Sequence, residues 1–230
     1  MPNIDFYYSI DKDAENWIDR IFNQENITFI PQKDIIDKYP KNLLDKVQAV
    51  NNYEEAKQIV TNFLKNDAIN SNKAFVIEEE LKALKSSWKA RENHFFVALE
   101  KILEKPIYTE NFSGYLTTFF KCPYSEKENW FMINFWSSLP EQITTIAHEI
   151  LHLQFLHQYR PILEKSLDEE KIQNLKEALT FLLNEREFNG VLLKQDKGYE
   201  NHAILRENLK NLWRESREFH LFLLEAMEIV

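Results

Sequence analysis

Two histidines and a glutamate near the middle of the chain have the spacing of a metal site. The segment His148-Glu149-Ile-Leu-His152 separates the histidines by four residues, so on an α-helix both imidazoles lie on one face, about one turn apart. Imidazoles at this spacing bind Zn²⁺, and the carboxylate of Glu149 then lies beside the metal position. A catalytic zinc keeps one coordination position for water and lowers the pKa of that water to about 7. The pattern predicts one zinc ion per chain, held by His148 and His152, with Glu149 as the base that takes a proton from water.

The same short pattern occurs by chance in helices that bind nothing, and its flanks distinguish the two interpretations. Apolar residues surround the three polar ones on nearly all sides: Ile146, Ala147, Ile150, Leu151, Leu153, Phe155 and Leu156. We therefore expect the helix to be buried. Unpaired polar side chains in an apolar setting cost several kcal/mol, and a metal ion is the partner that suits this spacing.

A catalytic zinc needs a third protein ligand, and we expect it from the following helix. Glu177 is a charged residue in an otherwise apolar stretch, where a metal would compensate for the cost of burying it. A glutamate at the rim of the protein, paired with Lys176 or Arg186, is the alternative. His157 is not favoured, because nine residues after His148 it points to the opposite side of the same helix.

Two other carboxylates compete with Glu177 by spacing alone. Glu169 and Glu170 fall in the first turn of the predicted helix, where acidic residues interact favourably with the helix dipole. We place them second for that reason. Thr180 and Asn184 share the helical face of Glu177, and we expect them to orient the histidines by hydrogen bonds.

Hydrolysis at such a site also needs a donor that stabilises the oxyanion opposite the metal. The helix entry that follows Gly198 carries three suitable side chains, and His202 or Tyr199 is the expected donor. A purely structural role is the alternative, with Tyr199 as a packing aromatic and Arg206 as one half of an ion pair on its helix.

Composition limits the classes of protein that the chain could be. The net charge of −9 disfavours nucleic-acid binding, which needs a basic patch, and three glycines exclude Gly-rich phosphate loops. Cys122 is the only cysteine, so no internal disulfide can form. We find no signal peptide and no apolar run of the roughly 18 residues that a membrane span requires. A cytoplasmic protein without nucleic-acid or membrane partners is expected, and the oligomeric state stays open.

The apolar periodicity and the low glycine content predict an α+β fold that is mainly helical, with a small antiparallel or mixed sheet before the metal helix. Helices are expected at about 11–24, 53–66, 72–104, 138–157, 166–183 and 201–228. The metal helix should begin at Ser138 or Pro140 and end before Pro161. Ser166 and Glu169 have the spacing of a capping box at the start of the next helix.

Two aromatic-rich and β-branched stretches precede the metal helix and predict strands. Residues 114–121 and 129–137 are expected to form a hairpin, whose free edge could accept an extended peptide by backbone hydrogen bonds. A boundary near Pro106 would separate a helical N-terminal region, 1–105, from a catalytic region, 106–230, unless both form one compact domain.

With its H-E-x-x-H motif and its downstream glutamate, the chain resembles the zincin metallopeptidases and, among them, the gluzincin branch. The resemblance implies that His148, His152 and Glu177 bind zinc and that Glu149 activates water. It implies a zinc-dependent metallopeptidase that hydrolyses peptide bonds in a peptide or protein substrate. Three alternatives remain: a catalytically inactive zincin-fold protein that binds a partner, a zinc hydrolase of a non-peptide amide, and a helical interaction protein with an accidental motif.

Overall fold

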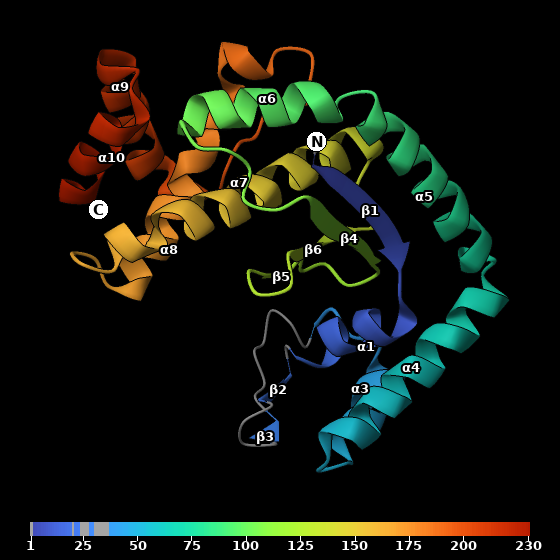
Figure 1. Cartoon of the computed structure of the whole chain (residues 1–230). Coiled ribbons are helices and arrows are strands. Elements are labelled where there is room, and N and C mark those ends of the chain that lie inside the picture. The colour runs from blue at the N-terminus through green and yellow to red at the C-terminus, as the bar shows by residue number, and fades with distance from the viewer. Residues whose placement is uncertain (1, 20, 24–27, 30–36) are drawn as a thin grey trace.

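The chain folds into helices arranged around a four-stranded sheet, and β2 and β3 pair separately as a two-stranded sheet (Figure 1). The computed structural model describes residues 2–19, 21–23, 28–29 and 37–230. The strands are β1 (Asn3–Tyr8), β2 (Phe22–Asn23), β3 (Thr28–Phe29), β4 (Asn111–Thr117), β5 (Tyr124–Ser125) and β6 (Trp130–Asn134). The α-helices are α1 (Ile10–Ile18), α3 (Lys41–Gln48), α4 (Tyr53–Asn70), α5 (Lys73–Lys89), α6 (Glu92–Leu103), α7 (Leu139–Leu163), α8 (Glu169–Ala178), α9 (Ala203–Ser216) and α10 (Phe219–Glu228). Three short 3₁₀ turns, η1 (Leu179–Asn184), η2 (Arg186–Phe188) and η3 (Glu200–His202), lie between α8 and α9. The predicted α+β class, mainly helical with a small mixed sheet ahead of the histidine-bearing helix, is confirmed.

The main sheet is mixed and has the strand order β1-β4-β6-β5. β1 pairs with β4 and β4 with β6 in parallel, whereas β5 runs antiparallel to β6. The predicted hairpin of 114–121 with 129–137 is therefore wrong. The segment that was assigned to the turn of the hairpin contains β5. After β4 the chain first forms β5 and then reverses near Asn129, where φ is +55°. The next strand, β6, lies between β4 and β5. β5 consequently lies at one edge of the sheet.

One hydrophobic cluster joins the sheet to the helices from α5 to α10. In its centre, Gly114 of β4 is in register with Phe6 of β1 and with Phe131 of β6. A Cβ at Gly114 would lie 2.8 Å from Phe6 Cδ1, so this strand packs at full density only with glycine there. β1 thus shares a sheet and a core with the C-terminal part of the chain, and the boundary near Pro106 stays a prediction.

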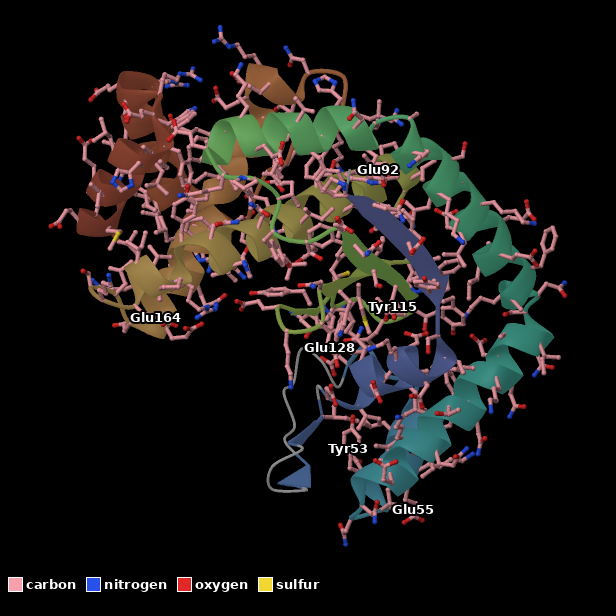
Figure 2. All side chains as sticks on the ribbon, viewed as in Figure 1. Tyr53, Glu55, Glu92, Tyr115, Glu128 and Glu164 are labelled. Atoms are coloured by element: carbon pink, nitrogen blue, oxygen red, sulfur yellow. The ribbon has the colours of Figure 1, made fainter. Side chains whose placement is uncertain are left out.

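Glu92, labelled in Figure 2, ties the start of β1 to the helices above it. Its Oε1 accepts a hydrogen bond of 3.1 Å from the backbone N–H of Ile4, and its Oε2 lies 2.6 Å from Lys89 Nζ. The backbone N–H of Ile4, at this edge of the sheet, therefore bonds to the Glu92 side chain where another strand would otherwise pair.

The predicted single helix over 72–104 is two helices, α5 and α6. The backbone N–H of Arg91 bonds to the carbonyl of Trp88 at 2.8 Å, which is the tighter i→i−3 pattern of a helix end. The rings of Trp88 and Phe95 lie 5.1 Å apart on either side of this break, and both are buried. Seven residues apart, the two side chains would share one face of a straight helix but lie about two turns apart, and the bend brings their rings into contact.

Helix α7 begins as predicted and ends later. Glu141 Oε2 accepts a 3.0 Å hydrogen bond from the backbone N–H of Ser138 and so caps the first turn. The helix continues through Pro161 to Leu163, because a proline in the last turn removes only one hydrogen bond. The cap predicted at Ser166 lies instead at Asp168, whose side chain accepts from the N–H of Lys171 at 2.9 Å.

The region predicted as one helix over 201–228 is divided into η3, α9 and α10. Arg217 has φ +54° and ends α9, and α10 then returns against α9 (Figure 1). None of the helices in the described part of the chain combines the length and the apolar character that a membrane span needs.

A second hydrophobic cluster lies between α1, α3 and α4, below the sheet in Figure 1. Buried Asp13 of α1 connects this cluster to the end of β4. Its Oδ1 accepts from Thr117 Oγ1 at 2.7 Å and from the N–H of Thr118 at 2.9 Å, and its Oδ2 accepts from Thr118 Oγ1 at 2.7 Å. Tyr8 donates to the same carboxyl group at 3.1 Å. One carboxyl group of α1 therefore satisfies four donors, one from the end of β1 and three from the end of β4.

We expect Asp13→Ala to lower the free energy of unfolding by about 2–4 kcal/mol, because several buried donors lose their acceptor. Denaturant titration measures the change. Asp11→Ala is the matched control on the same helix: Asp11 is exposed and pairs with Lys57 at 2.9 Å, so its removal should cost less than about 1 kcal/mol. Equal losses in the two variants would contradict the role of the buried network.

Candidate metal centre

Helices α7 and α8 bring the two histidines and Glu177 to one point. His148 Nε2 lies 3.4 Å and His152 Nε2 3.5 Å from Glu177 Oε2, and the two imidazole rings are 4.2 Å apart between centroids. The three ligand atoms lie within 4.8 Å of one another. The structure therefore gathers the three residues that the sequence selected as metal ligands.

The bonding state of these atoms fits a cation. His152 is only 1% exposed, and its Nε2 and Glu177 Oε2 are buried without a hydrogen-bond partner among the described residues. Such atoms carry an uncompensated desolvation cost. Two imidazole nitrogens and one carboxylate oxygen are also a donor set that zinc accepts in catalytic sites, with a further position free for water.

Lys176 fixes the other oxygen of Glu177. Its Nζ lies 2.9 Å from Glu177 Oε1 and donates to the hydroxyl of Tyr124 at 3.0 Å, although the lysine is 97% buried, with 3% of its surface exposed. The ion pair between Glu177 and Lys176, which was the alternative to metal binding, is thus present. It occupies only Oε1 and leaves Oε2 directed at the histidines. Arg186 lies beside Glu187 instead, at 3.4 Å.

Asp196 is the important site residue that the sequence analysis missed. Its Oδ2 lies 2.8 Å from His148 Nδ1, and its Oδ1 accepts from Thr180 Oγ1 and from Arg206 Nη2, each at 2.8 Å. A carboxylate on Nδ1 fixes the ring and leaves Nε2 directed at the shared centre. Thr180, which was expected to orient a histidine directly, acts on His148 through Asp196. Arg206 forms the ion pair that was its alternative assignment.

The loop around Asp196 is built to hold that carboxylate in place. Asn184 binds its backbone on both sides, accepting from its N–H at 3.0 Å and donating to its carbonyl at 2.7 Å. Gly198 has φ +65°, and a Cβ there would lie 3.0 Å from Arg206 Nη1, so glycine is required beside the buried guanidinium. The Asp-Lys-Gly turn in the sequence was the available signal for this loop.

The cluster is strongly coupled through its charges. Burial alone lowers the pKa of His148, but the hydrogen bond to Asp196 and the nearby carboxylate of Glu177 outweigh burial and raise it to about 10. Burial raises the pKa of the Asp196 and Glu177 carboxyls, but their charged neighbours outweigh burial. His148 lowers the pKa of Asp196 below its ordinary value, and His148 together with Lys176 does the same for Glu177. Burial, followed by the charge of His148, holds the pKa of His152 well below its usual range. A proton on His148 therefore competes with a cation for one position.

Glu149 lines an open cavity next to the cluster. The cavity has a volume of about 330 Å³ and includes Cys122, His148 and Tyr199. A second hollow of about 310 Å³ shares His148, Asp196 and Tyr199 with it, so the two form one cleft. Burial raises the pKa of Glu149 to about 7, the range in which a general base works best near neutral pH.

The two candidates for the oxyanion donor lie in different places. The ring of Tyr199 is 6.4 Å from that of His148 between centroids and forms part of the cleft wall. Partial burial and the nearby Glu177 raise the pKa of Tyr199 to about 12, so its hydroxyl stays a donor. His202 lines neither hollow, and its Nε2 lies 3.1 Å from Asn174 Oδ1. The geometry favours Tyr199.

The competing ligands lie outside the group of three. His157 stacks on Tyr108 with 4.0 Å between ring centroids. Glu169 accepts a 2.7 Å hydrogen bond from Arg160, and Glu170 is exposed. None of these side chains belongs to the cluster of potential ligands found among the described residues.

A histidine pair on one helix, a carboxylate from the next and a small mixed sheet define the class of zincin-like metallopeptidase proteins. The model of the Peptidase_M78 family, the IrrE N-terminal-like domain, matches residues 107–225, which is more than half of the chain. The chain belongs to this family. No curated protein and no solved structure matches it. The matched segment contains β4 to α9 and most of α10, and with them every residue of the metal centre described above.

We expect Asp196→Asn to weaken zinc binding by about 10–100-fold, the usual effect of losing a carboxylate behind a ligating histidine. The amide NH₂ would face His148 Nδ1 and favour the tautomer with its proton on Nε2, which cannot bind metal. Competition with a chelator measures the affinity. Asp45→Asn, at an exposed position of α3, is the control, and an equal affinity in the two variants would remove Asp196 from the site.

Zinc affinity should also rise with pH. The hydrogen bond to Asp196 and the nearby carboxylate of Glu177 overcome burial and raise the pKa of His148 to about 10, so near neutral pH zinc must displace a proton that the folded site holds tightly. One displaced proton corresponds to roughly a tenfold gain in apparent affinity per pH unit between about pH 6 and 8. Chelator competition at several pH values, corrected for the chelator's own protonation, gives the slope. A flat profile would contradict the coupling.

Proposed function

We propose that this protein is a zinc-dependent metallopeptidase of the gluzincin type, with His148, His152 and Glu177 as the zinc ligands. The observation that carries the proposal is the buried meeting point of His152 Nε2 and Glu177 Oε2, two atoms without hydrogen-bond partners in the described structure. A cleft that contains Glu149 opens beside them. Membership of the Peptidase_M78 family supports the same assignment.

When bound there, zinc would supply a Lewis acid and a water of lowered pKa. Glu149 would be the base that accepts a proton from a water in the cleft as the water attacks the scissile carbonyl carbon, and the acid that gives the proton to the leaving amine nitrogen. Tyr199 donates a hydrogen bond to the developing oxyanion from the cleft wall. Asp196 keeps the Nδ1 proton of His148 in place throughout, and Lys176 keeps Glu177 directed at the centre by holding Oε1.

A peptide substrate is supported by the position of β5. This strand is the edge of the sheet, and its Tyr124 accepts a hydrogen bond from Lys176, the neighbour of the third ligand. An extended peptide that adds to this edge by backbone hydrogen bonds would run close to the metal position. A non-peptide amide would not use the edge, which is why we favour the peptidase.

Metal analysis of the purified protein should find about one zinc per chain, and none in His148→Ala, which loses a ligand. Glu149→Gln should keep the zinc and cleave peptides about 10²–10⁴-fold more slowly, because it lacks the base. A peptide library with mass-spectrometric readout measures cleavage. Glu170→Gln, an exposed change on α8, should behave like the parent protein.

The outcomes separate the alternatives. Full zinc loading without cleavage of any peptide would favour a zincin-fold binding protein that has lost catalysis. Cleavage by Glu149→Gln at the parent rate would remove Glu149 from the mechanism. A thermal stability that is the same with and without chelator, in the parent and in His148→Ala, would indicate an accidental motif.

A further inference from the structure

Three lysines line the cleft of a protein that is acidic as a whole. Lys121 lines the cavity on one side of His148, and Lys194 and Lys197 line the hollow on the other side. All three lysines are exposed, whereas the whole chain has a net charge of −9. The carboxylates of Glu141, Glu149 and Asp196 line the same two hollows, but they are half-buried or buried, so the exposed charges of the cleft are those of its lysines.

Two of these lysines are not neutralised. Lys194 forms an ion pair with Glu141. Among the residues that the structure describes, neither Lys121 nor Lys197 has a carboxylate within ion-pair distance. Lys121 Nζ lies 5.7 Å from the centre of the Phe120 ring, and Lys38 Nζ lies 6.0 Å from the same ring. An additional positive charge thus lies at the Lys121 end of the cleft.

The acidic groups inside the cleft do not pair with Lys121 or Lys197. Glu149 is only 7% exposed, Glu141 forms an ion pair with Lys194, and Asp196 has partners of its own. Asp196 lies 2.8 Å from Arg206 Nη2 and 2.8 Å from His148 Nδ1. A cleft with one sign of uncompensated charge concentrates its field and attracts groups of the opposite charge. What remains exposed at both ends of this cleft is positive.

The walls also offer aromatic surface between the charges. Phe120 and Tyr199 line the cavity, and Trp136, next to the lining residue Ser137, is 61% exposed. Lysines beside aromatic rings also occur where proteins bind single-stranded nucleic acid. A long polyanion, however, would approach a protein of net charge −9, and repulsion outside the cleft opposes its binding. A short acidic segment of a peptide meets only the positive part.

We propose that the substrate segment carries Asp or Glu side chains on both sides of the scissile bond, bound by Lys121 at one end of the cleft and by Lys197 at the other. This inference rests on the proposed peptidase function and names its substrate class. The acidic side chains of the substrate replace the carboxylates that the two lysines lack, and apolar substrate residues between them contact Phe120 and Tyr199.

A zinc-loaded peptide library should show the preference directly. Cleaved peptides should be enriched in Asp and Glu near the cut, and replacing these by Asn and Gln in a cleaved peptide should lower kcat/KM by about tenfold or more, mainly through KM. The preference should weaken at high salt, because the contacts are exposed. In Lys121→Glu/Lys197→Glu, the ratio between the acidic peptide and its amide counterpart should fall to one or below.

A matched control separates the cleft from the overall charge. Lys85→Glu/Lys165→Glu changes two exposed lysines outside the cleft and alters the net charge by the same amount. It should keep the parent preference. Zinc content and far-ultraviolet circular dichroism confirm that both double variants fold.

Binding is measured separately from turnover with zinc-loaded Glu149→Gln and an immobilised random peptide library. The protein should be retained by acidic peptides, and this retention should depend on Lys121 and Lys197. Such a result supports the inference even if no peptide is cleaved, in which case the proposed function alone fails. Cleavage without acidic preference, or a preference that the cleft double variant keeps, overturns the inference and leaves the peptidase in place. Tighter lysine-dependent binding of a single-stranded oligonucleotide than of any acidic peptide also overturns it.

Discussion

The structure depends on one constraint at the junction of α7 and α8. His152 and Lys176 are buried there and His148 and Glu177 half-buried, and each of these ionisable side chains must be compensated where water is excluded. His148 is compensated by Asp196, and Glu177 by Lys176. Both ring nitrogens of His152 are unpaired, and so is Oε2 of Glu177. Glu149 Oε2 and His152 Nδ1 are unpaired as well, but only His152 Nε2 and Glu177 Oε2 converge on one point with the other histidine. Such a convergence of free atoms is what a cation-binding site requires and what a merely structural ion pair would avoid.

The elements after and before α7 are arranged to support these two compensating groups. From the C-terminal side, Arg206 of α9 binds Asp196, which binds His148. From the sheet side, Tyr124 of β5 binds Lys176, which binds Glu177. A ligand from α7 and one from α8 are therefore each connected to a different part of the fold, so the separation of the ligand atoms is set by the packing of α9 and of the sheet edge as well as by the two helices.

The sequence predicted the parts of the site that local pattern determines. The histidine pair follows from the period of a single helix, and Glu177 is conspicuous because a charge interrupts an apolar face. Asp196 carries no such signal, since it lies in a loop 48 residues from His148 and its role arises only from tertiary contact. The prediction of the strand pairing failed for the same reason. Strand β1 pairs Asn3 with Asn111, and no local pattern shows that this pairing is parallel or that β6 lies between β4 and β5.

The N-terminal helices, which lie outside the segment matched by the family model, contribute to the cleft through β4. Asp13 and Asn16 of α1 both bind Thr117 Oγ1, at 2.7 and 2.9 Å, and Asn16 also donates to the carbonyl of Lys121 at 2.8 Å. The segment between these two residues carries Phe120 and leads to Cys122, both of which line the cavity beside Glu149. A free loop would lose conformational entropy whenever it closed on a substrate. Because α1 already holds this wall at several points, the cleft is formed before a substrate arrives, and the helical N-terminal region acts as the support of one side of the site.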